Sequence, residues 1–305
     1  MQIIRSLAEL PDAARGGAAT IGNFDGVHLG HLRIVRRMLE RAEEVGRAGV
    51  VFTFDPHPVR ILRPDECPPP LTWTRRKADL LAAQGVEWVV AYPTDEALLE
   101  LSAQQFFLQI VCDTLQVKAL VEGPNFFFGH DREGDVHRLR ELTAAAGMTL
   151  DVVEPVTVDG ELVSSSRIRR LVAAGDVGAA GRMLSAPYRI RGMVTHGAGR
   201  GAKLGFPTAN LDAIDTLLPA HGVYAGRGWA GSDSWPAAIN LGPSPTFGDA
   251  LVKVEVHMIG CTQPLYGLPL EVDFCQRLRD IRPFGSKDAL AAQLARDVDR
   301  VKQLN

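Results

Sequence analysis

The first half of the chain alternates short apolar runs with longer helical patterns. The apolar runs have the length of buried strands and stand at residues 18–21, 50–54, 88–92, 119–121 and 150–153. Between them, amphipathic helical patterns stand at residues 32–45, 75–83, 103–115 and 136–146. Strands that alternate with helices predict a parallel sheet covered by helices on both faces. Because ligands of such sheets bind beyond the carboxyl ends of the strands, the loops after the strands are candidate sites.

After residue 184 the sequence changes to glycine, proline and short alternating segments. Strand-like segments stand at residues 188–195, 222–229, 235–241, 252–259 and 268–274, which predicts a small antiparallel barrel. Residues 286–302 form one amphipathic helical pattern with Ser286 as its cap. The fold class is therefore α/β plus β. We expect a Rossmann-like parallel-sheet domain over 1–184 and an antiparallel β-barrel domain with a terminal helix over 185–305.

Composition limits the partners and the compartment. The length of 305 residues suits about two domains, and the net charge of -3 argues against a general nucleic-acid binder. The four cysteines form no CxxC pair, and no signal-peptide pattern opens the chain, so a reducing cytoplasm is expected. Apolar runs are too short to span a membrane. We expect a cytoplasmic monomer or weak homo-oligomer that binds small molecules.

The segment GNFDGVHLGH (22–31) joins the first apolar run to the first helical pattern. His28 and His31 are three residues apart in the first helical turn, so they share one face. A helix N-terminus suits a phosphate, because it carries unpaired N–H groups and partial positive charge. Two imidazoles there can donate hydrogen bonds to an α-phosphate under attack, which is the chemistry of AMP transfer. The alternatives are ordinary structural histidines and half a zinc site, for which no third ligand stands at a suitable spacing.

Two further segments of the first half suit a nucleotide or a flat ligand. VSSSRIRR (163–170) opens a helical pattern, where its hydroxyls and arginines either cap the helix or bind the leaving phosphates of a triphosphate. GPNFFFGH (123–130) follows the fourth apolar run. Its three aromatic residues belong either to the core or to a surface that stacks on a fused ring.

The second half contains a separate candidate site. THGAGRGAKLGFPTAN (195–210) is glycine-rich, and its N–H groups suit a phosphate, although flexibility alone explains most such loops. Thr208 and Asn210 would share one strand face and offer neutral oxygens to Mg²⁺ that keeps several waters. Glu255 stands between two valines, so we expect it to point into the barrel, where an acid is costly without a function. It suits a base that accepts a hydroxyl proton during phosphoryl transfer, and the alternative is an outward-facing, solvated side chain.

Together these segments resemble the bacterial bifunctional riboflavin kinase/FMN adenylyltransferase family, also called FAD synthetase. The resemblance runs from Ile21 to about Val298 and rests on ten segments in one order: GNFDGVHLGH, FTFDPHP, GPNFFFG, SSSRIR, LGFPTANL, HGVYAG, NLGPSPTFG, VEVHMIG, LYGLPLEVDF and LRDIRPF. It implies that the first half adenylates FMN and the second phosphorylates riboflavin. ATP is then the co-substrate, riboflavin, FMN and FAD are substrate and products, and Mg²⁺ is the cofactor.

The resemblance also implies a role for each matching residue. The catalytic residues are expected to be Glu255, His28, His31 and Arg167. Contacts to ATP are expected from Gly22, Asn23, Phe24, Asp25, Gly30, Ser164, Ser165, Ser166, Gly197, Gly199, Lys203 and Gly205. Contacts to the flavin are expected from Asp55, Pro56, His57, Asn125, Phe126 and Phe128. The metal is expected at Thr208 and Asn210.

Other functions predict other sequence features. An HxGH-type aminoacyl-tRNA synthetase should have a KMSKS-like lysine loop and a basic RNA-binding surface, and the sequence has neither. Adenylyltransferases that act on pantetheine or nicotinamide substrates share the first motif but not the second half. A flavin-binding sensor or carrier with decayed catalysis is the alternative from a different class. Riboflavin bound without turnover would favour that alternative.

Overall fold

The structure is a computed structural model, and it describes residues 1–197, 199–244 and 249–304. The chain forms two compact units. The first consists of Met1–Pro68 and Trp73–Ser164, and the second of Pro69–Thr72 and the chain from Ser165 onward. Each unit has its own sheet, so each is described by itself.

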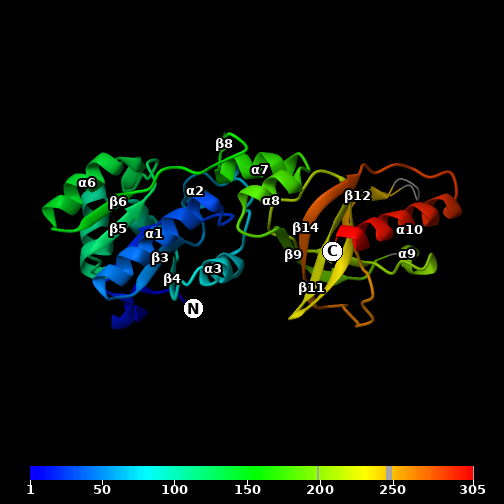
Figure 1. The fold of residues 1–305 in the computed structure, drawn as a ribbon, viewed down its shortest axis with the longest axis horizontal. Coiled ribbons are helices and arrows are strands. Elements are labelled where there is room, and N and C mark those ends of the chain that lie inside the picture. The colour runs from blue at the N-terminus through cyan, green and yellow to red at the C-terminus, as the bar shows by residue number, and fades with distance from the viewer. Residues whose placement is uncertain (198, 245–248, 305) are drawn as a thin grey trace. The chain divides into compact units, whose positions relative to one another are not determined.

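The first unit is built on a parallel sheet with the strand order β1-β4-β3-β2-β5-β6. Its strands β3, β4, β5 and β6 are labelled in Figure 1. The strands are β1 (Gln2–Ile4), β2 (Ala18–Ile21), β3 (Gly49–Phe54), β4 (Trp88–Tyr92), β5 (Ala119–Glu122) and β6 (Thr149–Val152). The predicted parallel sheet is confirmed, and only the three-residue β1 has no counterpart among the predicted strands. The strand order reverses between β2 and β5, and the carboxyl ends at such a switch point are where ligands bind.

Helices cover both faces of this sheet. Successive strand residues point to opposite sides, and in strands such as β3 both sets of side chains are mostly apolar and buried. The longer helices are α1 (Leu29–Val45), α3 (Thr74–Ala82), α5 (Ala103–Phe106) continued by the π-helix η4 (Phe107–Leu115), and α6 (Val136–Ala145). On one face, Met38 of α1 and Leu81 of α3 join the core cluster of Val51. On the other, Phe107 of η4 joins the cluster of Phe52. The doubly covered sheet is therefore as predicted.

Short elements complete the first unit. They are α2 (Pro58–Leu62), α4 (Glu96–Leu99), the 3₁₀ turns η1 (Leu7–Glu9), η2 (Asp12–Ala14), η3 (Pro64–Glu66) and η5 (His130–Arg132), and a hairpin of β7 (Thr157–Val158) with β8 (Glu161–Leu162). Residues 64–70 include the single turn η3. The serine-rich segment VSSSRIRR (163–170) directly follows the hairpin. The Val163 N–H donates to the Val156 carbonyl and so joins the two ends of the hairpin.

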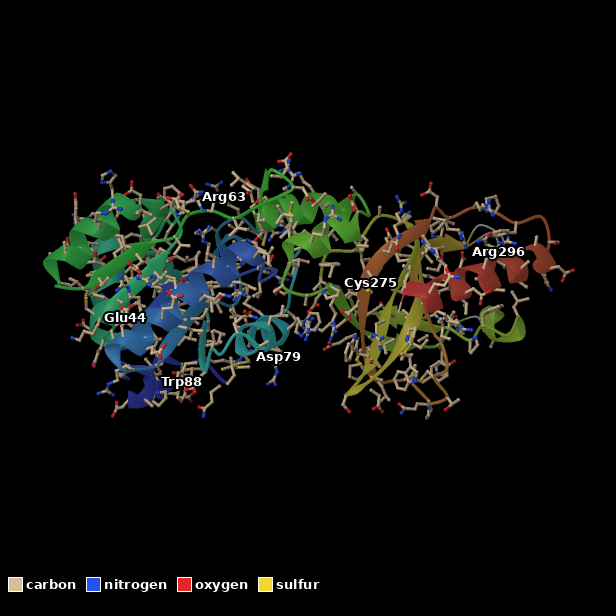
Figure 2. All side chains as sticks on the ribbon, in the orientation of Figure 1. Glu44, Arg63, Asp79, Trp88, Cys275 and Arg296 are labelled. Atoms are coloured by element: carbon tan, nitrogen blue, oxygen red, sulfur yellow. The ribbon has the colours of Figure 1, made fainter. Side chains whose placement is uncertain are left out.

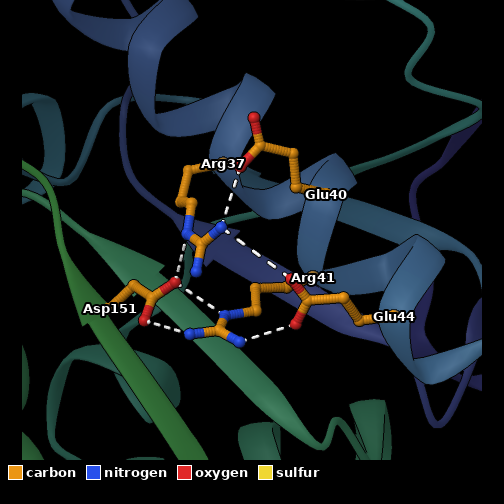
Figure 3. A network of polar contacts seen from close by, with 5 residues as sticks. All are labelled: Arg37, Glu40, Arg41, Glu44 and Asp151. Atoms are coloured by element: carbon orange, nitrogen blue, oxygen red, sulfur yellow. Dashed lines mark hydrogen bonds and ion pairs between the residues drawn. The ribbon is translucent and has the colours of Figure 1, made fainter.

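An ion-pair network fixes α1 on the edge strand β6 (Figure 3). Asp151 of β6 accepts from Arg41 Nε at 2.7 Å and from Arg37 Nε at 2.5 Å. Glu40 and Glu44 pair with the same two arginines from one helical turn away. The hydrogen bond from Arg41, the largest cause, and that from Arg37 hold the pKa of Asp151 below its ordinary value. Such charge-assisted pairs are strong, so the helix that carries both histidines has a fixed position.

The second unit contains a closed antiparallel barrel in the order β10-β13-β12-β11-β14-β9. Its strands are β9 (Tyr188–Thr195), β10 (Ala209–Asp212), β11 (Gly222–Ala230), β12 (Asp233–Ser244), β13 (Asp249–Met258) and β14 (Pro269–Arg279). Phe274 packs on Tyr188 and Tyr224 with ring centroids 6.4 and 5.2 Å apart. All three rings are almost completely buried. The predicted small barrel is confirmed.

The helices of the second unit, over its described residues, are α7 (Ser165–Ala173), α8 (Val177–Met183), α9 (Arg200–Lys203) and α10 (Lys287–Leu304). The terminal helix α10 lies along β11 and β12 (Figure 1). Ser286 Oγ accepts from the Ala289 N–H at 3.1 Å, which confirms the predicted cap. Helix α8 packs on β14 and β9, and α7 packs on α8. Both helices therefore belong to the second unit, whose long segment begins at Ser165. The domain boundary at 184/185 stays a prediction.

Among the described residues, no helix is both long and apolar enough to cross a membrane. The cysteines Cys67, Cys112, Cys261 and Cys275 are all free. Cys275 lies on β14 and is exposed (Figure 2).

Candidate active sites

The turn between β2 and α1 has an unusual backbone. Phe24 and Val27 have φ angles of 46° and 41°, a left-handed conformation that is costly for bulky and β-branched residues. Both side chains are nonetheless buried in the core cluster under α1. Strain of this kind persists only where the surroundings hold it, and here it places His28 at the helix N-cap.

His28 and His31 form a reciprocal capping box. His28 Nδ1 accepts the backbone N–H of His31 at 3.2 Å, and His31 Nδ1 accepts the backbone N–H of His28 at 3.3 Å. The two rings stack, with centroids 3.6 Å apart and planes 13° apart. Because both Nδ1 atoms are acceptors, each neutral imidazole must carry its proton on Nε2. The pair therefore presents two Nε2–H donors.

Burial keeps both imidazoles neutral. His28 is 7% exposed, and desolvation is the main cause that lowers its pKa to about 4. The pKa of His31 lies well below its ordinary value, first through desolvation and then through repulsion by His28 and Lys77. Two stacked rings this close could not both be charged. The two residues thus act as neutral donors near pH 7.

This pKa shift predicts a pH-dependent local stability. The folded pKa of His28 lies below the unfolded value, so the stabilising effect is complete above about pH 6.5 and is lost as the pH falls toward 4. The loss through His28 is expected to be about 3 kcal/mol. Amide hydrogen exchange of α1 in the full chain, measured at pH 7 and 4.5, should show it. His28→Asn keeps a cap acceptor but does not titrate, so parallel pH profiles for the two proteins would contradict the assignment.

Gly30 makes room for the ring of His28. A Cβ at position 30 would lie 3.1 Å from His28 Cε1 and Nδ1. That is closer than an ordinary van der Waals contact, so the imidazole would have to move. The glycine between the two histidines is therefore a packing requirement of the stacked pair.

Lys77 of α3 donates hydrogen bonds to the same turn. It is 7% exposed, and its Nζ donates to the Asn23 carbonyl at 2.6 Å and to Thr53 Oγ1 at 3.1 Å. Thr53 also donates to the Asn23 carbonyl, so the loops after β2 and β3 share one edge. Sequence reasoning did not single out Lys77. The available signal was a lysine on the apolar face of the helical pattern, four residues before the buried Leu81.

Glu122 is a second group that sequence reasoning missed. The ladder between β2 and β5 covers only Ala18 and Ala19 of β2. Beyond it, the buried Glu122 accepts the Ile21 N–H at 2.8 Å through Oε1. Burial raises the pKa of Glu122 well above its ordinary value. A carboxyl group thus bridges the two strands at the switch point, directly before the turn that carries His28.

The residues expected to contact a flavin take two kinds of position. Asp55 follows β3, and its Oδ2 accepts from Thr74 Oγ1 at 2.6 Å and from Arg5 at 3.0 Å. Pro56 accepts from Thr94 through its carbonyl, and His57 caps α2 through Nδ1. After β5, Asn125 is exposed and Phe126 half-buried, whereas Phe128 is a core residue with 6% exposure. Phe126 stacks on Phe128 at 5.4 Å, so Asn125 and Phe126 are the ones accessible to a ligand.

The serine-rich segment divides between the two units. Ser164 ends the first unit, whereas Ser165, Ser166 and Arg167 open α7 in the second. Ser166 is exposed, and Arg167 is half-buried. The joint action of these residues with His28 and His31 therefore stays a prediction.

The second candidate site is a cavity of about 150 Å³ on the barrel unit. One side is lined by the strand residues Asn210, Asn240, Glu255 and His257 and by Thr208, which directly precedes β10. Helix α10 closes the other side with Leu290, Leu294 and Val298. Polar strand residues and apolar residues of the helix thus meet in the cavity, which Asp297 of α10 also lines. Thr208, Asn210 and Glu255, predicted as one site, are brought together.

Glu255 does not point into the barrel interior as expected. Its neighbours Val254 and Val256 are 3% and 1% exposed and fill the interior, so strand alternation turns Glu255 to the opposite face. There it pairs in register with Asn210 of β10 and Asn240 of β12. Asn240 Nδ2 donates to Glu255 Oε2 at 3.4 Å. Apolar residues of the terminal helix cover this outer face, so the carboxylate faces a cavity without lying inside the barrel.

The glycine-rich loop packs directly on the proposed metal residues. A Cβ on Gly197 would lie 2.0 Å from Asn210 Nδ2, and a Cβ on Gly201 would lie 3.4 Å from Thr208 Oγ1. Gly199 and Gly201 line the cavity, whereas Gly205 is an exposed residue with a φ of 84°. Ala198 and the side chain of Lys203 lie outside the described part of the structure. The backbone of the loop therefore lies directly against the side chains of Thr208 and Asn210.

The oxygen groups of this cavity suit Mg²⁺ better than a transition metal. The described residues contain no cluster of three or more His, Cys, Asp or Glu side chains that could hold a metal ion. Mg²⁺ is commonly bound by few protein oxygens, several waters and substrate phosphates. The neutral side-chain oxygens of Thr208 and Asn210, beside one carboxylate, fit such a site.

Comparison with known proteins assigns each half to a family. The FAD synthetase family model matches residues 10–167, and the riboflavin kinase family model matches residues 184–305. The bifunctional riboflavin kinase/FMN adenylyltransferase of Pseudomonas fluorescens is 38% identical over 305 residues, covering 100% of this chain and 98% of that protein. The protein of the same name from Escherichia coli K12 is 33% identical, covering 97% and 96%.

A solved structure supports the fold over the whole length. A crystal structure described as a macrolide-efflux protein from Streptococcus pneumoniae superposes with a TM-score of 0.87 at 28% identity. The match covers 99% of this chain and 98% of that one. The two sheets described above therefore recur together in another protein.

Proposed function

Because the chain belongs to the bifunctional riboflavin kinase/FMN adenylyltransferase family, it is a transferase with both activities, and we propose which residues carry each of them. It phosphorylates riboflavin to FMN with ATP, then adenylates FMN to FAD with a second ATP and releases pyrophosphate. The observation that carries this conclusion is that one family model matches each half.

We propose that the kinase reaction takes place in the cavity beside α10. Glu255 accepts the proton of the ribityl 5′-hydroxyl as its oxygen attacks the γ-phosphorus, and ADP leaves with the electrons of the broken bond. Thr208 and Asn210 would hold Mg²⁺, which supplies positive charge to the phosphates when bound. Asn240 orients the carboxylate by donating to Oε2. The glycine-rich loop, with Gly197, Gly199, Lys203 and Gly205, is proposed to contact ATP.

We propose that the adenylyl transfer takes place at the turn after β2. A phosphate oxygen of FMN attacks the α-phosphorus of ATP, and pyrophosphate leaves. The Nε2–H groups of His28 and His31 donate to the α-phosphate oxygens, where negative charge builds up. The capping box supports this proposal, because it commits both Nδ1 atoms and leaves both Nε2–H groups available.

We propose the remaining ligand contacts as well. Pyrophosphate is proposed to leave toward Arg167 and the hydroxyls of Ser164, Ser165 and Ser166. Gly22, Asn23, Phe24, Asp25 and Gly30 are proposed to contact ATP, and Phe24 would do so through its backbone because its side chain is buried. The flavin is proposed to lie against Asn125 and Phe126 and near Asp55, Pro56 and His57, with Phe128 supporting Phe126 from the core. The enzyme is proposed to work in the cytoplasm as a monomer or weak homo-oligomer.

A chromatographic time course tests the function directly. The purified chain is incubated with riboflavin, ATP and Mg²⁺, and FMN, FAD, ADP and pyrophosphate are followed. FMN should appear first and FAD after it, with ADP and pyrophosphate in step. FMN alone would contradict the assignment of the first unit, and bound riboflavin without any product would favour a flavin carrier.

Gly30→Ala is expected to impair only the adenylyl transfer. The added Cβ displaces the His28 ring, and small misplacements of a catalytic group cost about tenfold or more in rate. Conversion of supplied FMN to FAD should fall by about tenfold while riboflavin phosphorylation is unchanged. Gly181→Ala in α8 is a matched control, since a Cβ there has nothing within 4 Å. Equal effects of the two substitutions would contradict the role of Gly30.

A further inference from the structure

His257 lies on the same face of β13 as Glu255, two residues further along. Both side chains line the cavity of the kinase site, together with Thr208 and Asn210. The proposed kinase reaction gives His257 no task. A titratable side chain this close to the proposed base therefore needs an explanation of its own.

The imidazole of His257 is tied to the segment that precedes Thr208. Its Nδ1 lies 2.7 Å from the carbonyl oxygen of Pro207. A carbonyl oxygen only accepts, so Nδ1 must carry the proton and donate. The ring of Phe206 meets the imidazole edge-on, with centroids 5.6 Å apart and planes 76° apart. One side chain thus contacts both residues before the predicted metal ligand.

The sheet itself does not hold that segment. The ladder of β10 with β13 begins at Ala209, opposite Val256, and the ladder with β9 begins at Asn210. Pro207 has no N–H with which to extend either ladder. The hydrogen bond from His257 therefore takes the place of a ladder bond at the position just before Thr208.

We propose that His257 is a positioning residue for the kinase reaction: its Nδ1–H holds the Pro207 carbonyl so that the hydroxyl of Thr208 stays beside Asn210 and Glu255. The proposal rests on the function proposed above for those three residues. Donation from Nδ1 fixes the tautomer of the imidazole and leaves Nε2 unprotonated, and the proposal gives that nitrogen no part in the proton transfer. The effect of His257 reaches the substrate only through Thr208.

Substitutions that separate the two ring nitrogens test this role. The amide nitrogen of Asn can reach the place of Nδ1, whereas that of Gln reaches the place of Nε2. We expect His257→Ala and His257→Gln to raise the Mg²⁺ concentration for half-maximal riboflavin phosphorylation by about tenfold to a hundredfold. At saturating Mg²⁺, kcat should fall less than about threefold, and His257→Asn should recover most of the Mg²⁺ dependence.

Hydrogen exchange gives a readout that needs neither metal nor turnover. In the ligand-free full chain, backbone amides of residues 206–211 should exchange faster in His257→Ala and regain protection in His257→Asn. Conversion of FMN to FAD, which is proposed to take place at the turn after β2, should be unchanged in every variant and reports that the first unit is folded. If His257→Ala does not fold, the Asn and Gln variants decide by the same two measurements.

Three results would overturn the proposal. One is an unchanged Mg²⁺ dependence in His257→Ala, and another is equal behaviour of Asn and Gln at position 257. The third is a loss of kcat at saturating Mg²⁺ as large as that of Glu255→Gln, which would make His257 a chemical participant. If instead Glu255→Gln keeps full kinase activity, the proposed base is wrong, and the exchange result for residues 206–211 still decides the role of His257.

Discussion

Glu255→Gln should abolish FMN formation and leave the conversion of supplied FMN to FAD at the wild-type rate. Gln is nearly isosteric and can still accept the hydrogen bond from Asn240. It cannot take up the hydroxyl proton, and the loss of a general base costs about 10²- to 10⁴-fold in rate. The measurement is two separate assays on the full chain: riboflavin with ATP and Mg²⁺, and FMN with ATP and Mg²⁺.

Two further variants sharpen this result. Glu255→Asp keeps a carboxylate but withdraws it by one methylene, so it should retain part of the kinase activity that Gln loses. Asn240→Ala removes the donor to Oε2 and should have a smaller effect than either change at Glu255. Loss of both activities in Glu255→Gln would contradict separate sites, and an unaffected kinase rate would exclude Glu255 as the base.

The architecture was largely predictable because it depends on repeated patterns. Strands such as β3 are continuous apolar runs, since a parallel sheet covered on both faces buries both sets of side chains. The terminal helix and its Ser286 cap follow from amphipathic spacing and a local hydroxyl. The three-residue β1 was not predicted, because a segment this short contains too few residues to show a period.

The sites were predictable in their residues but not in their geometry. Strand alternation shows that Glu255 and its valine neighbours face opposite ways, but not which face lies inside the barrel. That depends on α10, which covers the outer face from a distant part of the chain. Lys77 and Glu122 were missed for a related reason. Each is a polar residue within an apolar pattern, and its partners, Asn23 and Ile21, are fixed only by the tertiary fold.

The histidine pair combines a structural role with a chemical one, and Asn substitutions can separate the two. An Asn at position 28 caps the helix as well as His28 does, because its side-chain oxygen can accept the His31 N–H. The amide nitrogen of this Asn does not reach the place of His28 Nε2, so the Nε2–H donor is lost. His28→Ala removes both functions and should cost about 1 kcal/mol more in the stability of α1 than His28→Asn.

His28→Asn and His31→Asn should each lower the rate of FAD formation from FMN by about 10²- to 10³-fold, the usual cost of removing one donor to a developing negative charge. Riboflavin phosphorylation should be unchanged, because it takes place on the other unit. The double variant should lose less than the product of the two single effects, since each ring holds the other through the capping box and the stack. Normal FAD formation in His28→Asn would mean that the imidazoles only cap the helix. An equal loss of both activities would mean that the pair supports the fold of the whole chain. A loss confined to adenylyl transfer, with the cap retained, would leave donation from Nε2–H to the α-phosphate as the function of the pair.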